Sequence, residues 1–487
     1  MSSPIALLAV LLPVLGGGVL PFLPGHRAAA RGVILAAAGC FGLCCALPWE
    51  APGAGWLAPD HLGIALAILT SFTGLTTACF SAGYIDRECA AGRMGRGAAR
   101  LYHGAFPFLL GALIAALLSD NIGLTWIAVE AATIAGVLVV GLPATAEAIE
   151  ASWKYFILCG VAIALSLFGT IILYVAAVPA LGEGAAAMRW SALATAAPRA
   201  NGALLNLAFV FLLIGYGTKA GLAPLHGWLA DAHAEGPTPV SAILSGAMLN
   251  VALVVLLRLR MIIGANAEAG MGAVSPGPPM MALGLLSLLV AAFALWQRRD
   301  AKRFFAFSSI EQNGLIAFAF GLGGAAAIFA GLLHMVLHTL AKAAVFQCIG
   351  RAAQWRGGQT FDDLGGLLGS QRRLALTLGC AILAVAGLPP FGLFSSEFLL
   401  ATATARQAIW CSPLLVLGLV VGGWALLARL QGLWLGPPRP AQGPAPGPAP
   451  RFAMLLPAWL HLVLVLVLGL AMPGPVLAFL QQAAALR

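Results

Sequence analysis

The chain has 487 residues, of which 61% are hydrophobic and only 9% are charged. With a mean hydropathy of +0.96, the composition lies far outside that of a soluble globular domain, so we expect an integral membrane protein. The net charge of +9 does not indicate a nucleic-acid partner, because the basic residues form no continuous patch with interleaved aromatic side chains.

Fourteen apolar segments are long enough to cross a hydrocarbon core about 30 Å thick, which takes about 20 helical residues. We therefore predict an all-α polytopic membrane protein with a single membrane domain over residues 1–487. In chain order, the predicted spans are 4–24, 32–48, 62–85, 103–119, 121–142, 153–178, 203–222, 238–260, 280–297, 304–322, 325–349, 373–404, 411–432 and 453–480.

The basic residues indicate how these spans are oriented. Connections that follow odd-numbered spans hold most of the 26 Lys and Arg residues. By the positive-inside rule the richer face is cytoplasmic, so both termini are expected on the non-cytoplasmic side.

Two segments rich in glycine and proline are expected to break helices inside the membrane. Gly215–Pro224 interrupts the seventh span and Ala386–Gly392 interrupts the twelfth. Broken membrane helices occur where the freed backbone groups line a cavity or are buried in protein. The two segments are similar and lie five spans apart, which would give two five-helix repeats opposite orientations. An inverted repeat is one of two interpretations at this point, the other being a chance local similarity.

Three ionisable residues lie in or beside apolar runs. Glu130 lies within Ile122–Leu142. Lys219 follows a run that begins near Leu204, and Lys342 lies within a third run. A charge at the bilayer centre costs roughly 2.5–3.5 kcal/mol even on insertion scales, so such residues usually face a bundle interior or a water-filled path. Glu130 is either protonated and neutral or paired across the bundle with a lysine such as Lys219.

A stripe of titratable residues is expected on one helix. His334, His338 and Lys342 are spaced four residues apart, so they share one helical face. Histidine titrates near neutrality and a buried lysine can release its proton there, so the stripe is a candidate proton relay. The alternative is that the histidines are hydrogen-bonded packing residues. Glu397 follows the second break and is either a carboxylate of the same path or an interfacial acid close to solvent.

Further candidates lie near the first break and in the tenth span. Asp231 and His233 follow the first break and are expected near a membrane surface, as a vestibule for proton uptake or as a capping turn. His226 is a further candidate for proton entry or an auxiliary role. Glu311, near the start of the tenth span, is a candidate auxiliary acid. The sequence contains no paired-cysteine, HExxH or nucleotide-binding motif, so we expect no cofactor and no bound metal.

Four stretches carry a resemblance to a known family. They are KAGLAPLHGWLADAHAEGPTPVSAILSGAMLN from Lys219, RDAKRFFAFSSIEQNG from Arg299, HMVLHTLAKAAVF from His334 and GLPPFGLFSSEF from Gly387. The chain resembles the antiporter-like subunits of respiratory complex I, Mrp-type sodium/proton antiporters and membrane-bound hydrogenases. Ser-Ser-Ile-Glu-Gln-Asn-Gly, Ser245 and Glu397 make it most similar to the hydrogenase-4 component F type. Many relatives carry a histidine where Ser245 stands, which leaves that relay step open.

The resemblance implies fourteen helices with two inverted five-helix repeats and broken helices 7 and 12. The first repeat would be 103–260, helices 4–8, and the second 280–432, helices 9–13. Matching motifs assign Glu130 and Lys219 as the charged pair of the first half-channel. They assign Lys342 as the central lysine, the two histidines of the stripe as part of a hydrated axis, and Glu397 as the terminal group.

We therefore expect a proton-translocating subunit of a multisubunit membrane oxidoreductase, in a bacterial or archaeal cytoplasmic membrane. Its partners would be other membrane subunits and a soluble redox module, with no redox site on the chain itself. The alternatives are a subunit of an Mrp-type sodium/proton antiporter, an ion-coupled membrane partner in inorganic carbon uptake, and a vestigial structural subunit.

Overall fold

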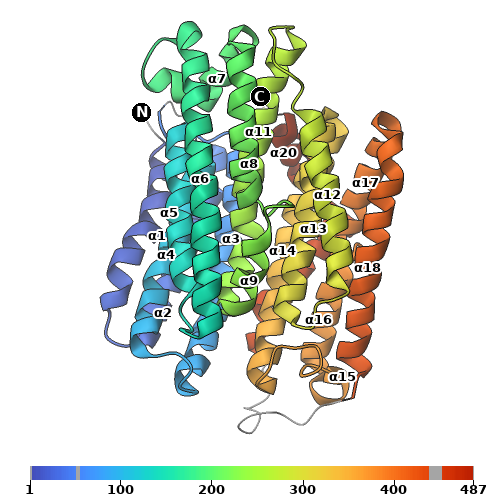
Figure 1. Cartoon of the computed structure of the whole chain (residues 1–487). Helices are drawn as coiled ribbons and strands as arrows, with labels where there is room; N and C mark the ends of the chain where they lie inside the picture. The colour runs from blue at the N-terminus through green and yellow to red at the C-terminus, as the bar shows by residue number, and fades with distance from the viewer. Residues whose placement is uncertain (1–2, 51–54, 438–451, 486–487) are drawn as a thin grey trace.

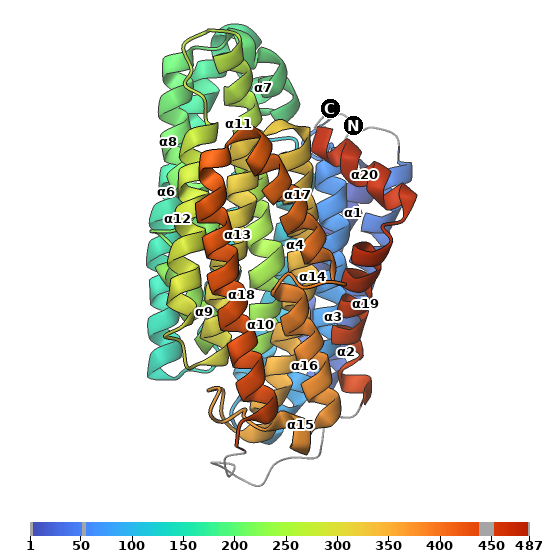
Figure 2. The same cartoon turned by 90° about the vertical axis from the view of Figure 1, so that its right-hand side faces the viewer.

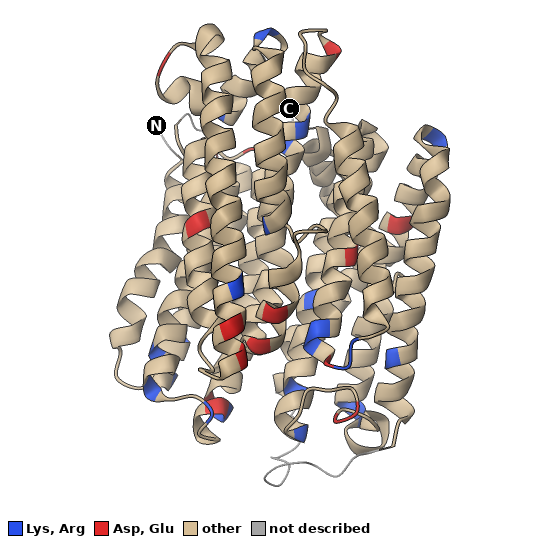
Figure 3. Ribbon diagram, in the orientation of Figure 1, with Lys and Arg blue, Asp and Glu red and all other residues tan. Residues whose placement is uncertain are grey.

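The computed structural model describes residues 3–50, 55–437 and 452–485. Regular structure in these ranges is helical, with isolated β-bridges as the only extended pairing. Figure 1 shows the long helices running side by side along one axis. Helix α1 begins and α20 ends at the same end of this bundle (Figures 1 and 2). Lys and Arg are more frequent towards the opposite end (Figure 3).

Twenty α-helices are present in the described ranges. They are α1 (Pro4–Val19), α2 (His26–Ala46), α3 (His61–Ala90), α4 (Arg96–Leu118), α5 (Ile122–Val140), α6 (Ala146–Leu181), α7 (Trp190–Ala196), α8 (Gly202–Lys219), α9 (Gly227–Glu235), α10 (Thr238–Ile243), α11 (Leu249–Glu268), α12 (Gly277–Leu295), α13 (Ala301–Leu322), α14 (Gly324–Arg356), α15 (Leu367–Ser370), α16 (Arg372–Val385), α17 (Gly392–Gln407), α18 (Ser412–Leu435), α19 (Leu456–Leu470) and α20 (Gly474–Ala485).

Eleven of the described helices are long and apolar enough to cross a membrane, or twelve if the bent pair α19 and α20 is one span. Helix α13 and the shorter helices α16 and α17 are not among them, although they overlap the predicted spans 304–322 and 373–404. The count of fourteen spans and the inverted repeats over 103–260 and 280–432 therefore stay predictions.

The fourteenth predicted span, 453–480, differs from a single straight helix. Helices α19 and α20 meet at 85°. Pro473 lies between them and Pro475 follows, and because proline lacks a backbone N–H the helical hydrogen bonds cannot continue through this segment. The second half of the span therefore turns aside and packs against α3 and α14.

The first predicted break is shorter than expected. Helix α8 stays helical through Lys219, and the irregular segment is 220–226. A Cβ on Gly215 would lie 2.6 Å from the Ala162 carbonyl oxygen, so this glycine permits close packing of α8 on α6 and does not end the helix. Two polar side chains satisfy the freed backbone: Asn313 donates to the Ala220 carbonyl at 2.9 Å, and the Ala223 N–H donates to Ser287 at 2.8 Å.

The second break lies where the sequence places it, at 386–391 between α16 and α17. A third irregularity was not predicted. Residues Leu244–Met248 form a π-helical turn, η5, between α10 and α11. Gly246 in this turn packs tightly on Thr339 of α14, where an added Cβ would lie 2.6 Å from the threonine methyl carbon. Isolated π-helical turns inside α-helices occur frequently at functional sites.

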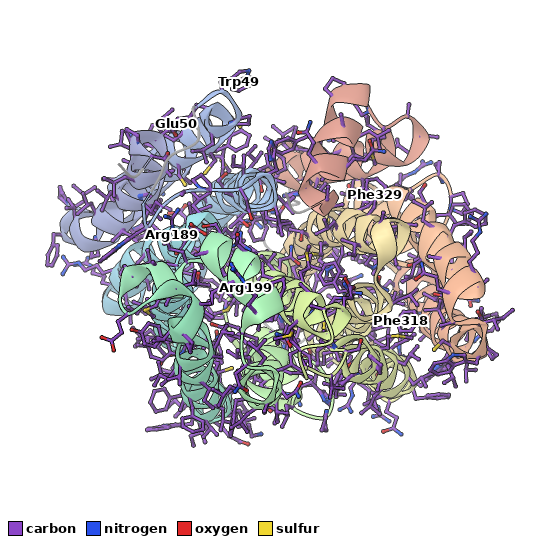
Figure 4. The ribbon with its side chains drawn as sticks, turned by 90° about the horizontal axis from the view of Figure 1, so that it is seen from above. Trp49, Glu50, Arg189, Arg199, Phe318 and Phe329 are labelled. Atoms are coloured by element: carbon purple, nitrogen blue, oxygen red, sulfur yellow. The ribbon has the colours of Figure 1, made fainter. Side chains whose placement is uncertain are left out.

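Helix α14 lies at the centre of the packing around these irregular segments. It contacts α3, α10, η5, α13, α16, α17 and α19. In the view along the bundle axis, Trp49 projects from the rim and is 84% exposed, whereas Phe318 of α13 is fully buried (Figure 4). All of the predicted relay stripe therefore lies on a helix that is enclosed by protein.

Candidate functional site

The ammonium group of Lys219 is enclosed by hydroxyl and aromatic groups. Lys219 is the last residue of α8 and is completely buried. Its Nζ donates to Thr133 Oγ1 at 2.7 Å and to the Tyr155 hydroxyl at 3.3 Å. It also lies 4.8 Å from the centroid of the Tyr155 ring and 5.5 Å from that of Trp228, which are distances for cation–π attraction. Neutral groups therefore hold this cation.

Glu130 lies on the same side of α5 as Thr133, one helical turn earlier. The residue is half-buried, and its Oε2 atom is buried without a hydrogen-bond partner in the described chain. No ion pair within 4.0 Å joins Glu130 to Lys219, both of which the structure describes. Lys219 thus lies beside α5 and donates a hydrogen bond to the neutral hydroxyl of Thr133, not to the carboxylate of Glu130.

The two histidines of the predicted stripe are buried on α14. Nδ1 of His334 lies 2.9 Å from Ser396 Oγ, and its Nε2 lies 2.6 Å from Gln312 Oε1. The rings of His334 and His338 are nearly parallel, with centroids 6.4 Å apart and an interplanar angle of 7°. Both ring nitrogens of His338 are buried with no partner among the described residues. The stripe predicted from the four-residue spacing is therefore present as a row of neighbouring groups.

Lys342 is the third member of the row and is completely buried. Its Nζ donates to the backbone carbonyl of Phe305 at 2.7 Å and lies 5.5 Å from the centroid of the Phe305 ring. The same carbonyl accepts a hydrogen bond from Ser309 Oγ at 3.0 Å, one turn along α13. Because two donors converge on one oxygen, the amine and the Ser309 hydroxyl are close neighbours.

Ser309 continues this set of contacts to η5. Its hydroxyl lies 2.8 Å from the hydroxyl of Ser245. Met248, one turn later in η5, accepts a hydrogen bond at its Sδ from Tyr155 at 3.1 Å. Tyr155 is also a partner of Lys219. The π-helical turn therefore lies between the surroundings of the two buried lysines.

The two acids of the second half lie against glycines. A Cβ on Gly387, in the second break, would lie 2.1 Å from Glu397 Oε2, and a Cβ on Gly422 of α18 would lie 1.9 Å from Glu311 Oε1. Glu311 is 1% exposed, and its Oε2 has no partner in the described part of the chain. Glu397 is half-buried. Each carboxyl group thus occupies space that only glycine leaves open.

This packing gives a stability prediction. Gly422→Ala should push the Glu311 carboxyl group away, at a cost of about 1–3 kcal/mol typical of overpacking, and should lower the midpoint of thermal unfolding in detergent. Gly423→Ala is the matched control, because its nearest neighbour would be the Ala386 carbonyl oxygen at an ordinary 3.9 Å. Equal midpoints for the two variants would contradict the packing described for Glu311.

The residues after the first break lie in different surroundings, and their role as a vestibule or as a capping turn stays a prediction. Asp231 pairs with Lys154 at 3.0 Å and Arg303 at 3.1 Å near the protein exterior. His233 is fully buried and stacks on Phe346 of α14 at 5.1 Å between centroids. Residues two apart on a helix point about 200° apart, so α9 presents these two side chains to opposite sides.

His226 lies at the N-terminal cap of α9 and is partly exposed. Its ring meets Phe307 edge-on at 6.0 Å between centroids. The structure therefore connects the row on α14, Ser245 and Lys219 through a series of neighbouring contacts, whereas His226 and Asp231 lie apart from them. The sequence did not lead us to Ser309, Tyr155 or Thr133. Only Thr133 could have been identified from its position, because it lies three residues, about one helical turn, after Glu130.

The chain is similar to several known proteins. Residues 119–422 match the family described as NADH:quinone oxidoreductase/Mrp antiporter, TM. A hydrogenase-4 component F homolog of Methylacidiphilum infernorum is 46% identical over 90% of each chain. Solved structures share the fold: a chain of the Mrp complex from Dietzia sp. has 20% identity and TM-score 0.82, covering 99% and 97% of the two chains. A chain of an archaeal membrane-bound sulfane sulfur reductase has 22% identity and TM-score 0.83, with the same coverage.

Proposed function

Because the chain belongs to the NADH:quinone oxidoreductase/Mrp antiporter transmembrane family, as an antiporter-like subunit, we propose that it moves protons within a multisubunit membrane oxidoreductase. The groups that carry them are Glu130, Lys219, Lys342 and Glu397, with His334 and His338 between the last two. Glu311, His226, Asp231 and His233 are auxiliary groups. The solved neighbours are chains of multisubunit membrane complexes. In this proposal the partners are further membrane subunits and a soluble redox module.

The proposal rests on the burial and the hydrogen-bond partners of Lys219 and Lys342. Each is completely buried, and each donates to neutral oxygen atoms with no carboxylate within 4.0 Å in the described chain. Burying an unpaired cation is strongly unfavourable, so a purely structural role would be better served by an apolar side chain. An amine that is held weakly as a cation can exchange its proton, which is what a relay requires.

The contacts support a route between the two lysines. Hydroxyl groups both donate and accept hydrogen bonds, so Ser245 and Ser309 can pass a proton by changing which oxygen donates. The Phe305 carbonyl can only accept, and it holds Lys342 beside Ser309. In this chain two hydroxyls thus form the link beside Lys342. The link can conduct a proton but cannot store one near neutral pH.

The electrostatic role of Glu130 follows from its position. It lies one turn from the hydroxyl that holds Lys219, in a protein interior where charges interact more strongly than in water. Protonating the carboxylate removes its attraction for the ammonium group. The lysine proton is then freer to move towards Tyr155 and η5. Energy from a partner subunit would act by changing this local field.

One experiment tests the proposed function as a whole. The intact complex, isolated in mild detergent and analysed by mass spectrometry, should contain further membrane subunits and a soluble redox module. In native vesicles it should drive proton uptake that does not depend on sodium. Uptake that requires sodium, with no redox module present, would contradict the proposal and support an Mrp-type antiporter. The orientation of the chain in the membrane can be measured in the same vesicles. Tags at both termini should be accessible only from the non-cytoplasmic face.

A smaller prediction concerns the hydroxyl link. Ser245→Ala should slow proton uptake by about tenfold, equivalent to about 1.4 kcal/mol of added barrier, because Ser309 then has no hydroxyl beyond it. Ser71→Ala is the control, since the Ser71 hydroxyl donates to carbonyls of its own helix. If the two variants transport equally well, Ser245 is not part of the route.

A further inference from the structure

A cavity of about 410 Å³ lies at one end of the bundle and shares no residue with the proposed relay. Its lining comes from the end of α12 and the turn that follows, the loop after α14, and α18. The lining residues are Trp296, Gln297, Arg299, Phe361, Asp362 and Arg429. Helices α12, α14 and α18 end and α13 begins at this end, towards which Lys and Arg are more frequent (Figures 1 and 3). By the positive-inside rule, the cavity is expected at the level of the cytoplasmic lipid headgroups.

Two backbone hydrogen bonds fix one wall of the cavity. The Ala301 N–H donates to the Gln359 carbonyl at 2.9 Å, and the Phe361 N–H donates to the Arg299 carbonyl at 2.9 Å. These bonds join the start of α13 to the loop after α14. They hold Arg299 beside Phe361, so this wall is part of the fold.

Arg429 closes the cavity from the side of α18. Its Nη2 donates to the carbonyls of Trp296 at 3.2 Å and Arg298 at 2.9 Å. The guanidinium group also lies 5.0 Å from the centroid of the Phe361 ring. A guanidinium group has five N–H donors, and both of these bonds use Nη2. Arg429 is therefore held in place and keeps further donors for an anion.

The lining carries more positive than negative charge. Arg299 is exposed, and its side chain has no hydrogen bond or ion pair with another described residue. It shares the cavity with Arg429, so two like charges repel each other there. Asp362, which is exposed, is the only acid among the six lining residues and offsets one of the two charges. An anion between the two guanidinium groups would relieve their repulsion.

Apolar side chains on the outer surface lead towards the cavity. They are spaced three or four residues apart, so each set lies on one face of its helix. The exposed or nearly exposed sets are Leu286, Val290 and Phe293 on α12 and Leu417, Val420 and Trp424 on α18. These two helices pack against each other. Gln297 of the lining follows Phe293 at the same spacing, so the set on α12 runs up to the cavity.

Trp296 lies where the apolar surface meets the charged lining, and it is 44% exposed. Tryptophan is enriched at the membrane–water interface, where its ring lies at the level of the headgroups. Basic pockets between membrane helices on the cytoplasmic side bind anionic lipid headgroups. The positive lining, the interfacial tryptophan and the apolar surface together match the three parts of a phospholipid.

We propose that this cavity binds the headgroup of an anionic phospholipid. The phosphate lies between Arg299 and Arg429, and the acyl chains lie along the exposed apolar sets of α12 and α18. An acidic segment of a partner protein would match the charge of the lining alone, whereas a lipid also covers the apolar surface. The inference does not depend on proton transport.

The site is tested by photolabelling the intact complex in lipid nanodiscs. The probe is phosphatidylglycerol with a photoreactive group on the acyl chain near the glycerol, and mass spectrometry locates the label. We expect labelling at Phe293, Trp296 and Trp424 that unlabelled phosphatidylglycerol suppresses and phosphatidylcholine does not. Equal labelling by a phosphatidylcholine probe would mean bulk lipid only and would overturn the proposal. Suppression by inorganic phosphate alone would overturn it in favour of a free phosphate site.

Variants at Arg299 test the charge without disturbing the fold, because its side chain bonds to no described residue. Arg299→Gln should lower the labelling by about fivefold, equivalent to about 1 kcal/mol, whereas Arg299→Lys should retain most of it. Arg100→Gln is the matched control, since Arg100 is an exposed arginine of α4 outside the cavity. Equal labelling in Arg299→Gln and the wild type would overturn the proposal. So would capture of a partner subunit, in place of lipid, by a photoreactive amino acid at position 297.

Discussion

Replacing Lys342 with methionine should abolish proton transport while leaving the complex assembled. The amine is the point at which the hydroxyl link, the Phe305 carbonyl and the histidine row meet. Methionine fills a similar volume with an apolar, flexible side chain, so it removes the exchangeable proton without leaving a large cavity. It also removes a buried charge, so the fold should not be destabilised.

The measurement is proton uptake by native vesicles, normalised to the amount of this chain that copurifies with its partners. We expect a loss of at least about a hundredfold, equivalent to about 2.7 kcal/mol of barrier. Lys154→Met is the matched control, because Lys154 is a half-exposed lysine paired with Glu150 and Asp231 at the exterior. Transport at the wild-type rate in Lys342→Met would remove the central lysine from the mechanism.

Lys219→Met should have the second-largest effect. The amine is held by Thr133 and Tyr155, and no other titratable cation is hydrogen-bonded to these two side chains in the described structure. Without it, a proton at Glu130 has no amine next to it from which to continue towards η5. We expect uptake to fall by about thirtyfold or more, equivalent to about 2 kcal/mol.

Thr133→Val separates the role of the lysine from that of its surroundings. This variant keeps the amine and its hydrogen bond to Tyr155 but removes the closer 2.7 Å contact. Uptake should therefore fall less than in Lys219→Met, with assembly unchanged in both. A vestigial structural subunit predicts the opposite pattern, in which Lys219→Met impairs assembly and any transport by the assembled complex is unaffected.

Much of the fold was predictable because hydrophobicity and helix breakers act locally. Long apolar runs indicated most of the helices, and the Pro-Pro and Gly residues of 386–391 placed the second break correctly. Gly215 was misleading because a glycine that permits helix packing and one that ends a helix look alike in sequence. The 85° bend before α20 was missed, although Pro473 and Pro475 were visible signals.

The candidate site was predictable where spacing along one helix determines it. The stripe on α14, including Lys342, follows from such spacing, and Lys219 was identified from its place at the end of an apolar run. The partners of these residues come from other helices, so no local pattern indicates that Ser309 bonds to Ser245 or that Tyr155 reaches Lys219. The π-helical turn that brings Ser245 into place also depends on tertiary packing, through Gly246 against α14.

The central claim is that protons pass through this chain, and the most direct test is the number of protons moved per catalytic turnover of the intact complex. Wild-type and Lys219→Met complexes should be compared in sealed vesicles, with redox turnover and proton uptake measured on the same sample. We predict that the ratio falls in the variant while its redox module still turns over. An unchanged ratio would contradict the account, because the protons would then cross the membrane through other subunits.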